Sequence, residues 1–342
     1  MQPILSNFVY HLCSRIADNA MSLSKTYNSS EQMAELNFEF VYSVGYLELF
    51  HLGVQRLHEG FESSLSSGNA NMGFLCAAQS TTLSIISGVN NLALLKEIDF
   101  YLHLLGTYKN EMTKRLLLIC RKTVSMITDK GESTSVAVTE YPSNTIPRKL
   151  QDMAYVLETI ENYWLGYSKR SCHFAQKILA SLPKPGRLYR VLILFYHGLN
   201  LIDMLQKKMN AHRKREVKEI IASMKVIVPH AESNFKNKLE LLEAEKYALD
   251  EKHEQAEAFY DAAIASAKNY KFIHEEGLAC EKAGFYYKKR CDYQKAISYL
   301  KQSLACYKEW GSSVKIEVIR RELDAFNVQD ESETLRLPPD SR

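Results

Sequence analysis

The feature that most constrains this chain is an internal repeat in its C-terminal third. When this region is shifted by 40 residues, small, aromatic and large apolar residues fall on residues of the same kind. The matching pairs are Ala244 with Gly284, Tyr247 with Tyr287, Ala256 with Ala296, Phe259 with Tyr299, Tyr260 with Leu300, Ala263 with Ser303, and Ile264 with Leu304. Self-similarity at a fixed period of this length is typical of arrays in which one supersecondary unit stacks on the next.

The repeating residues are those expected where two antiparallel helices cross. Helices joined by a short turn approach closely only if small side chains lie at the crossing. The small residue of a first helix would face that of a second, as Ala244 would face Ala256, with aromatic and larger apolar residues beside them. This places Tyr247 and Tyr287 in the core and disfavours a role in stacking on a ligand. The predicted packing residues are Ala244, Tyr247, Ala256, Tyr260, Ala263, Gly284, Tyr287, Ala296, Leu300 and Ser303.

The rest of the chain also follows the period of a helix. Apolar residues recur three or four positions apart in segments such as 94–105. Glycine (14) and proline (8) are scarce among the 342 residues, whereas a β-sandwich or barrel needs many turns. These patterns predict an all-α protein, an α-solenoid of stacked antiparallel helix pairs with about twelve to sixteen helices.

Two segments interrupt the helical pattern and divide the chain. Residues 129–147 are rich in Ser and Thr and have no apolar period, which is typical of a flexible linker or loop. Residues 327–342 are polar and are predicted to form a disordered tail. We therefore expect an N-terminal helical-repeat array over 1–128 and a C-terminal array over 148–326.

Composition and cysteine usage indicate a soluble protein of the cytoplasm. The seven cysteines are widely spaced, form no CxxC motif and are expected to be reduced thiols. The first ten residues lack the basic region of a signal peptide. The longest uncharged stretch, 63–95, is interrupted by polar residues, so no membrane span is expected. A net charge of +3, from 43 basic and 40 acidic residues, makes a nucleic-acid partner unlikely.

No catalytic or metal-binding constellation is present in the sequence. There is no GxxxxGK[ST] loop, no HRD with DFG and no histidine-kinase phosphoacceptor box. The pairs His253-Glu254 and His274-Glu275 are not part of HExxH motifs, so structural or solvated roles are expected for them. We predict a protein that is not an enzyme, without catalytic residues, cofactor or metal.

A cluster of basic residues covers residues 207–218 (KKMNAHRKREVK). It is compatible with a phosphate-binding or nuclear-import patch. No aromatic residues are interleaved for stacking on bases, so a solvated connection between helices is favoured. Binding of nucleic acid through this segment is kept as a weaker alternative.

The spacing of small and aromatic residues in the repeat resembles the tetratricopeptide repeat (TPR). The usual TPR period is 34 residues. Here the extra residues 268–273 would lengthen the link between units, and the closing proline is absent, so the repeats are divergent. The resemblance implies that the inner face of each first helix binds a partner, which on this chain points to Glu245, Glu281, Phe285, Lys288 and Lys289.

A longer stretch, from Ala256 to Lys315, is similar to the TPR-like helical region of large multisensor signalling kinases. Those proteins combine a serine/threonine-kinase-like domain, an AAA-type ATPase, a helical region, a GAF domain and a histidine kinase. The resemblance is carried by Phe259-Tyr260-Asp261, Ala263-Ile264, Phe272 to Glu276, Leu278-Ala279, Glu281, Phe285-Tyr286, Ala296, Tyr299-Leu300, Cys306-Tyr307, Trp310-Gly311 and Lys315.

The resemblance implies a non-enzymatic helical-repeat scaffold in signal transduction, which is a fragment or a derivative of such a kinase. Its partners would be kinase-like, ATPase or GAF domains, in the same chain or in another. A partner on the concave face would couple mechanically to rearrangement of neighbouring domains. The main alternative is a piece of a larger protein kinase or ATPase whose catalytic domains lie outside this chain. The sequence does not indicate an oligomeric state.

Overall fold

The computed structural model describes residues 15–16, 19–20, 22–23, 26, 30–108, 110–129, 148–181 and 188–334, without the side chains of 30, 31, 148–150, 188 and 327–334. The described part is all-helical, which confirms the all-α class: it contains fourteen α-helices and two 3-10 helices. They are α2 (Ser30–Ser43), η1 (Gly45–Leu47), α3 (Phe50–Ser66), α4 (Ala70–Ser87), α5 (Asn91–Leu105), α6 (Glu111–Thr128), α7 (Arg148–Trp164), α8 (Ser168–Ser181), α9 (Leu188–Lys207), α10 (Ala211–Ile227), η3 (Val228–His230), α11 (Glu232–Leu249), α12 (His253–Asn269), α13 (Ile273–Lys289), α14 (Tyr293–Trp310) and α15 (Ser313–Thr334).

The turns between the last five helices recur every 20 residues. Glu251, Lys271, Cys291 and Gly311 all have a φ angle between 58° and 80°. In each turn the next residue donates its backbone N–H to a carbonyl five residues earlier, as Lys252 does to Tyr247 at 2.9 Å. This is the Schellman pattern, which ends a helix and satisfies its last carbonyls. The 40-residue repeat of the sequence is therefore two helices with two turns of the same kind.

Asn or Asp side chains cap the N-termini of several helices. The carboxamide oxygen of Asn90 accepts from the backbone N–H groups of Leu92 and Ala93, both at 3.1 Å, at the start of α5. Asn69, Asn110, Asn210 and Asp292 accept in the same way before α4, α6, α10 and α14. These caps satisfy N–H groups that have no partner within the helix.

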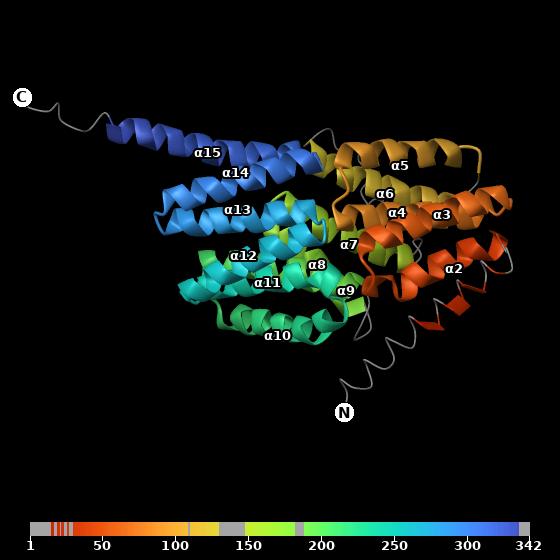
Figure 1. The fold of residues 1–342 in the computed structure, drawn as a ribbon, viewed down its shortest axis with the longest axis horizontal. Helices are drawn as coiled ribbons and strands as arrows, with labels where there is room; N and C mark the ends of the chain where they lie inside the picture. Colours follow the sequence, from red (N-terminus) through yellow and green to blue (C-terminus); the bar gives the residue numbers. More distant parts are fainter. Residues whose placement is uncertain are drawn as a thin grey trace, which may run out of the picture.

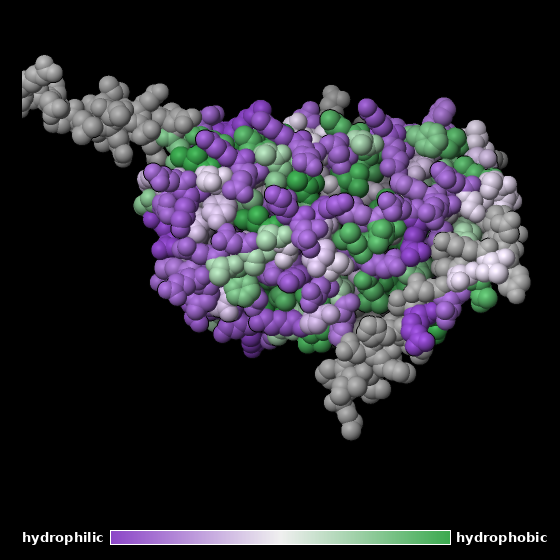
Figure 2. Space-filling view, viewed as in Figure 1, coloured by the Kyte–Doolittle hydropathy of each residue, from purple (hydrophilic) through white to green (hydrophobic). Residues whose placement is uncertain are grey.

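Helices that follow one another in sequence pack together in space. In Figure 1, α10 to α15 lie one above another in chain order, α2 to α6 lie on the opposite side, and α7 to α9 lie between them. The face drawn in Figure 2 is mostly hydrophilic, and its apolar side chains form small separate patches. Among the described helices, none has both the length and the apolar character needed to cross a bilayer.

Contacts cross the predicted division at 129–147, of which only Asp129 is described. The buried amide of Asn234, on α11, donates to the carbonyls of Tyr46 and Glu48 and accepts from the N–H of Phe50 at 3.0 Å. The hydroxyl of Ser312 donates to the carbonyl of Ile127 at 2.7 Å. The buried apolar residues of both regions belong to one cluster, so the helices on the two sides of 129–147 share one core.

Helix α15 extends further than the sequence predicts. It continues through 327–334, which were assigned to the disordered tail, and residues 335–342 lie outside the described part. The buried Ile319 and Phe326 anchor it as far as residue 326. No Gly or Pro interrupts the chain until Pro338, so the helix has no local reason to end at residue 327.

The repeat residues lie where the helices cross. All the predicted packing residues are buried except Tyr247, which is half-buried and stacks on Phe259 with ring centroids 5.3 Å apart. Tyr287 stacks on Tyr299 in the next pair at 5.4 Å. A Cβ atom added to Gly284 would lie 2.7 Å from Cγ of Leu300, so only glycine permits this approach of α13 and α14.

Candidate partner-binding groove

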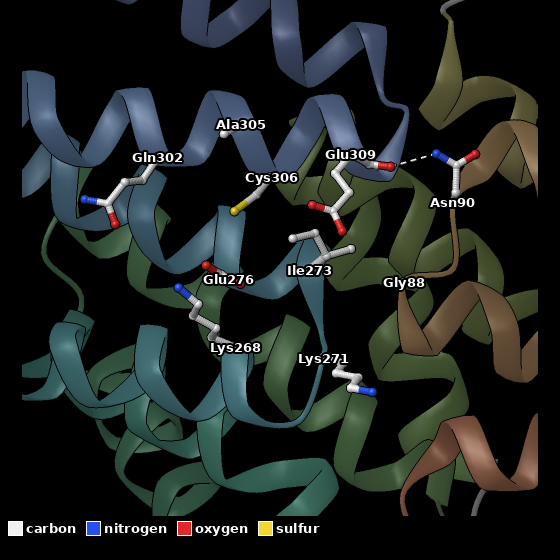
Figure 3. A pocket seen from close by; sticks show the side chains of 10 residues that line it. All are labelled: Gly88, Asn90, Lys268, Lys271, Ile273, Glu276, Gln302, Ala305, Cys306 and Glu309. Carbon is white, nitrogen blue, oxygen red and sulfur yellow. Dashed lines mark hydrogen bonds between the residues drawn. The ribbon is translucent and has the colours of Figure 1, made fainter.

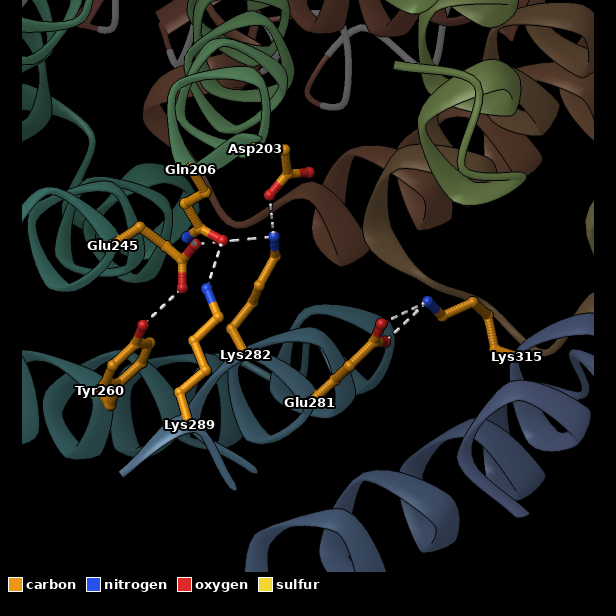
Figure 4. Close-up of polar contacts among 8 residues, drawn as sticks. All are labelled: Asp203, Gln206, Glu245, Tyr260, Glu281, Lys282, Lys289 and Lys315. Carbon is orange, nitrogen blue, oxygen red and sulfur yellow. Dashed lines mark hydrogen bonds and ion pairs between the residues drawn. The ribbon is translucent and has the colours of Figure 1, made fainter. Parts of the chain in front are cut away.

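A groove lies among α9, α11, α12, α13 and α15 and has a volume of about 730 Å³. We call it the α13 groove, since α13 contributes more of its lining than any other helix. It is lined by Asp203, Gln206, Glu245, Ala248, Leu249, Glu251, Tyr260, Lys282, Phe285, Tyr286, Lys288, Lys289 and Glu322. Figure 4 shows the polar side chains converging on it from α9, α11 and α13.

Four of the five residues suggested as a partner surface line this groove. Phe285 is half-buried and Lys289 is exposed, whereas Glu245 is only 2% exposed. Glu281 does not line it: its carboxylate is 2.7 Å from Nζ of Lys315 and accepts a hydrogen bond from the Tyr307 hydroxyl at 2.5 Å. The expectation of an exposed side chain is wrong for Glu281, because Lys315 of α15 and Tyr307 of α14 cover it. It is also wrong for Glu245, which is buried against Tyr260 and Lys282.

The floor of the α13 groove is a partly buried ion-pair network. Nζ of Lys282 lies 2.5 Å from Oδ1 of Asp203 and 3.6 Å from Oε2 of Glu245. Burial disfavours the charged ammonium, but the two carboxylates outweigh it and hold the pKa of Lys282 well above its usual value. Lys282 is therefore a fixed cation that neutralises part of the charge of Asp203 and Glu245.

A tyrosine completes the network at Glu245. The hydroxyl of Tyr260 donates to Oε1 of Glu245 at 2.5 Å. Burial, reinforced by the negative charge of Glu245, raises the pKa of Tyr260 well above its usual value, so it stays a neutral donor. Every oxygen that Glu245 presents to the floor is therefore already engaged, and we assign these groups to holding the groove in shape.

The rim of the groove carries the groups that remain available. Nζ of Lys289 donates to the neutral amide of Gln206 at 2.9 Å and is exposed. Nζ of Lys288 lies 2.5 Å from Oε2 of Glu322 on α15. Between these charges, Phe285 and Leu249 present half-buried apolar surface. The arrangement suits a peptide that places an apolar side chain on Phe285 and a polar group near Lys289.

The residues from α9 and α15 were not found by sequence reasoning. Asp203, Gln206 and Glu322 lie outside the 40-residue repeat, so no internal match points to them. The one local signal is Asp203, the only carboxylate of α9 (LYRVLILFYHGLNLIDMLQK), which lies between the apolar pairs 201–202 and 204–205. A carboxylate in such a place needs a buried partner, although the sequence does not say that it is Lys282.

A second cavity, drawn in Figure 3, has a volume of about 620 Å³ and lies between the α4–α5 turn and the ends of α12 and α14. The amide of Asn90 closes one edge by donating to the carbonyl of Glu309 at 2.7 Å. Burial raises the pKa of the Cys306 thiol to about 12 and also raises the pKa of Glu276. A thiol with so high a pKa is a poor nucleophile, so we assign no chemistry to this cavity.

His253 and His274, the histidines of the two His-Glu pairs, both pack against aromatic side chains. The sequence predicts a turn over 250–253, but His253 is the first residue of α12, and its Nδ1 lies 3.0 Å from the Tyr286 hydroxyl. His274 is the second residue of α13 and is buried between Trp164 and Trp310, against Gly88. Within the described residues, no group of three or more His, Cys, Asp or Glu side chains is placed to hold a metal ion.

The basic segment 207–218 is largely helical, where a connection was predicted. Lys207 ends α9, residues 208–210 form the connection, and the remaining residues begin α10 with an exposed face. Lys214 pairs with Asp250 at 2.7 Å and Arg215 with Glu219 at 3.6 Å. The Asn210 cap explains the early start of α10, because its side chain accepts from the N–H of Arg213 at 3.0 Å.

Comparison of the sequence with models of known protein families finds no match, and a search among curated proteins also finds none. The resemblance to the helical region of multisensor kinases remains a prediction from the residues that carry it.

Proposed function

We propose that this chain is a non-enzymatic scaffold whose α13 groove binds a segment of a protein partner. In this proposal the helices α11 to α15 form a divergent TPR-like solenoid of antiparallel pairs, as the repeat predicts. The cellular setting is cytoplasmic signal transduction, and the partners are kinase-like, ATPase or GAF domains in the same chain or in another. The setting and the partners rest on the family resemblance alone.

The observation that carries the proposal is the half-buried ring of Phe285 in the lining of a groove that also carries the ammonium groups of Lys288 and Lys289. The ion pairs of Lys282 hold the floor in one arrangement, so the groove needs little reorganisation to accept a ligand. Aromatic residues that are partly buried among polar groups are frequent anchors in protein interfaces. A bound segment would bury Phe285 and bring its own polar group to Lys289.

The groove also suggests how binding is transmitted. Its lining comes from five helices, the consecutive α11, α12 and α13 together with α9 and α15. A ligand that contacts several of them favours one relative position of these helices over others. We therefore propose that the partner acts by fixing the stack and, through it, the domains attached to either end.

The proposal is tested by selecting peptides of twelve residues from a random library on the full chain. The selected peptides are then measured by fluorescence anisotropy on the wild type, on Phe285→Ala and on the matched control Phe100→Ala. Phe100 lies on α5 and is 53% exposed, so the control also loses an accessible ring. We expect an at least tenfold loss of affinity for Phe285→Ala, as for an interface anchor, and little change for Phe100→Ala.

Two results would contradict the proposal. One is a failure to enrich any peptide on the folded chain. The other is a set of selected peptides that bind Phe285→Ala as tightly as the wild type.

A further inference from the structure

A smaller concavity lies beside the α13 groove, on a neighbouring face of α9. Its volume is about 470 Å³ and it is lined by residues 166–170, Met204 and Lys207. We call it the basic pocket, because Lys169, Arg170 and Lys207 line it and no carboxylate does among the residues that the structure describes. Gly166 lies in the turn before α8, Ser168 is the first residue of α8, and Lys207 comes from the end of α9.

The positive charge of the basic pocket is not compensated. Lys169 and Lys207 are exposed, and neither has an ion-pair partner within the described part of the chain. Asp203 on α9 is paired with Lys282 at 2.5 Å, Glu216 on α10 lies 2.9 Å from Nε2 of His197, and neither carboxylate lines the pocket. Like charges held together without a counter-charge repel one another, and an anionic ligand would relieve that repulsion.

The pocket also offers apolar surface. Tyr167 lines it and is 56% exposed, and Arg170 lies above the ring of Phe174 with its guanidinium carbon 6.0 Å from the centroid. Met209, two residues after Lys207, is 60% exposed. A cationic pocket with an accessible aromatic ring is complementary to an acidic chain that carries an apolar side chain.

The charge pattern favours a protein segment over a nucleic acid. A nucleic-acid surface needs a basic stripe that follows many phosphates. Here the basic charge does not continue evenly along α10, because Lys214 and Arg215 are paired with Asp250 and Glu219. The net charge of the whole chain is only +3. What remains is a compact cluster of a few cations, which matches a short run of carboxylates.

We propose that the basic pocket is a second docking site and that its occupant is an acidic segment of a protein partner. The carboxylates of that segment lie against Lys169, Arg170 and Lys207, and an apolar side chain packs on Tyr167. The proposal does not depend on the α13 groove, since none of these residues lines that groove.

The test uses a fluorescently labelled octaglutamate peptide that ends in leucine, with the octaglutamine analogue as the neutral probe. Binding to the full chain is followed by anisotropy at about 0.15 M salt, where the Debye length is about 8 Å, for the wild type and for Lys169→Glu/Lys207→Glu. The matched control is Lys301→Glu/Lys308→Glu, which makes the same change in charge at two exposed α14 lysines that are also unpaired in the described structure. Circular dichroism verifies that both variants are folded.

We expect the acidic peptide to bind the wild type and octaglutamine not to bind. The dissociation constant should rise at least about tenfold in Lys169→Glu/Lys207→Glu and less than twofold in the control, since charge pairs act over short distances in salt. Phe285→Ala should leave this binding unchanged. The proposal is overturned if the acidic peptide does not bind, if both double variants weaken it equally, or if single-stranded RNA of the same charge binds the pocket more tightly.

Discussion

The close approach of α13 and α14 at Gly284 leads to a prediction in which one substitution changes the sign of its effect. In Gly284→Ala, the new methyl group would lie 2.7 Å from Cγ and 2.8 Å from Cδ2 of Leu300, and 3.3 Å from the carbonyl oxygen of Ala296. The optimal separation of two carbon atoms is about 3.5–4.0 Å. The methyl group therefore does not fit unless Leu300 moves, and Leu300 is fully buried.

The magnitude follows from two opposing effects. Alanine is favoured over glycine in a helix by about 1 kcal/mol. Forcing an additional methyl group into a packed core costs about 1–3 kcal/mol. We expect Gly284→Ala to lower the free energy of unfolding by about 1 kcal/mol in the wild type, since the close contacts are multiple and one involves the backbone.

In the Leu300→Ala background the same substitution should be stabilising. Leu300→Ala alone creates a cavity and costs about 2–5 kcal/mol. The methyl group introduced by Gly284→Ala then enters the space that the leucine side chain vacates and keeps the helix preference of about 1 kcal/mol. The coupling free energy between the two substitutions should therefore reach about 2 kcal/mol.

The assay is equilibrium unfolding in urea, followed by the fluorescence of Trp164 and Trp310, which are the two tryptophans of the chain and pack with ring centroids 4.7 Å apart. The wild type, the two single variants and the double variant are compared by their free energies of unfolding. The comparison requires that their urea transitions have the same slope. If Gly284→Ala stabilises the wild type and the Leu300→Ala variant equally, glycine is not required at this crossing and the packing argument is refuted.

Three further predictions concern single side chains. Lys282→Met removes the cation between Asp203 and Glu245, so it should lower the free energy of unfolding by about 3–5 kcal/mol; adding Asp203→Asn should restore part of it, and a neutral effect of Lys282→Met would contradict the ion-pair account. Cys291 has a φ of 60°. Cys291→Gly should therefore be more stable than Cys291→Ala by about 1 kcal/mol and unfold at a higher urea concentration, because glycine has no Cβ strain there. Equal urea midpoints would argue against strain in this turn. Burial holds the pKa of His274 well below its usual value, with a smaller effect from neighbouring positive charge. The unfolded chain binds this proton below about pH 6.5 and the folded chain does not, so its contribution to stability is complete above that pH and is lost on acidification by about 1.4 kcal/mol per pH unit. His274→Gln should remove that part of the pH dependence in urea titrations between about pH 6.5 and 5, and identical slopes for the two proteins would show that the ring is not excluded from protonation.

Parts of the candidate groove were predictable and parts were not. The resemblance to the TPR pointed to the face that carries Phe285, Lys288 and Lys289, which share one side of a helix because they are three and four residues apart. It also placed Glu281 there, since helix geometry alone does not reveal that Lys315 reaches it from α15. The 40-residue repeat is compatible with a turn every 20 residues. The positive φ angles at Glu251, Lys271 and Cys291 could not be predicted, because these residues are not glycines.

The amino-acid sequence by itself determined the all-helical class, the helix pairs of the C-terminal region and the small residues at their crossings. These depend on contacts within about 20 to 40 residues, where periodicity and size directly reflect local geometry. Only the tertiary structure decided that Asn234 joins α11 to the start of α3, that Asp203 neutralises Lys282, and that both regions share one core. Those contacts join residues about 80 to 190 positions apart, and a single buried charge or amide does not specify, in the chain alone, which distant partner will satisfy it.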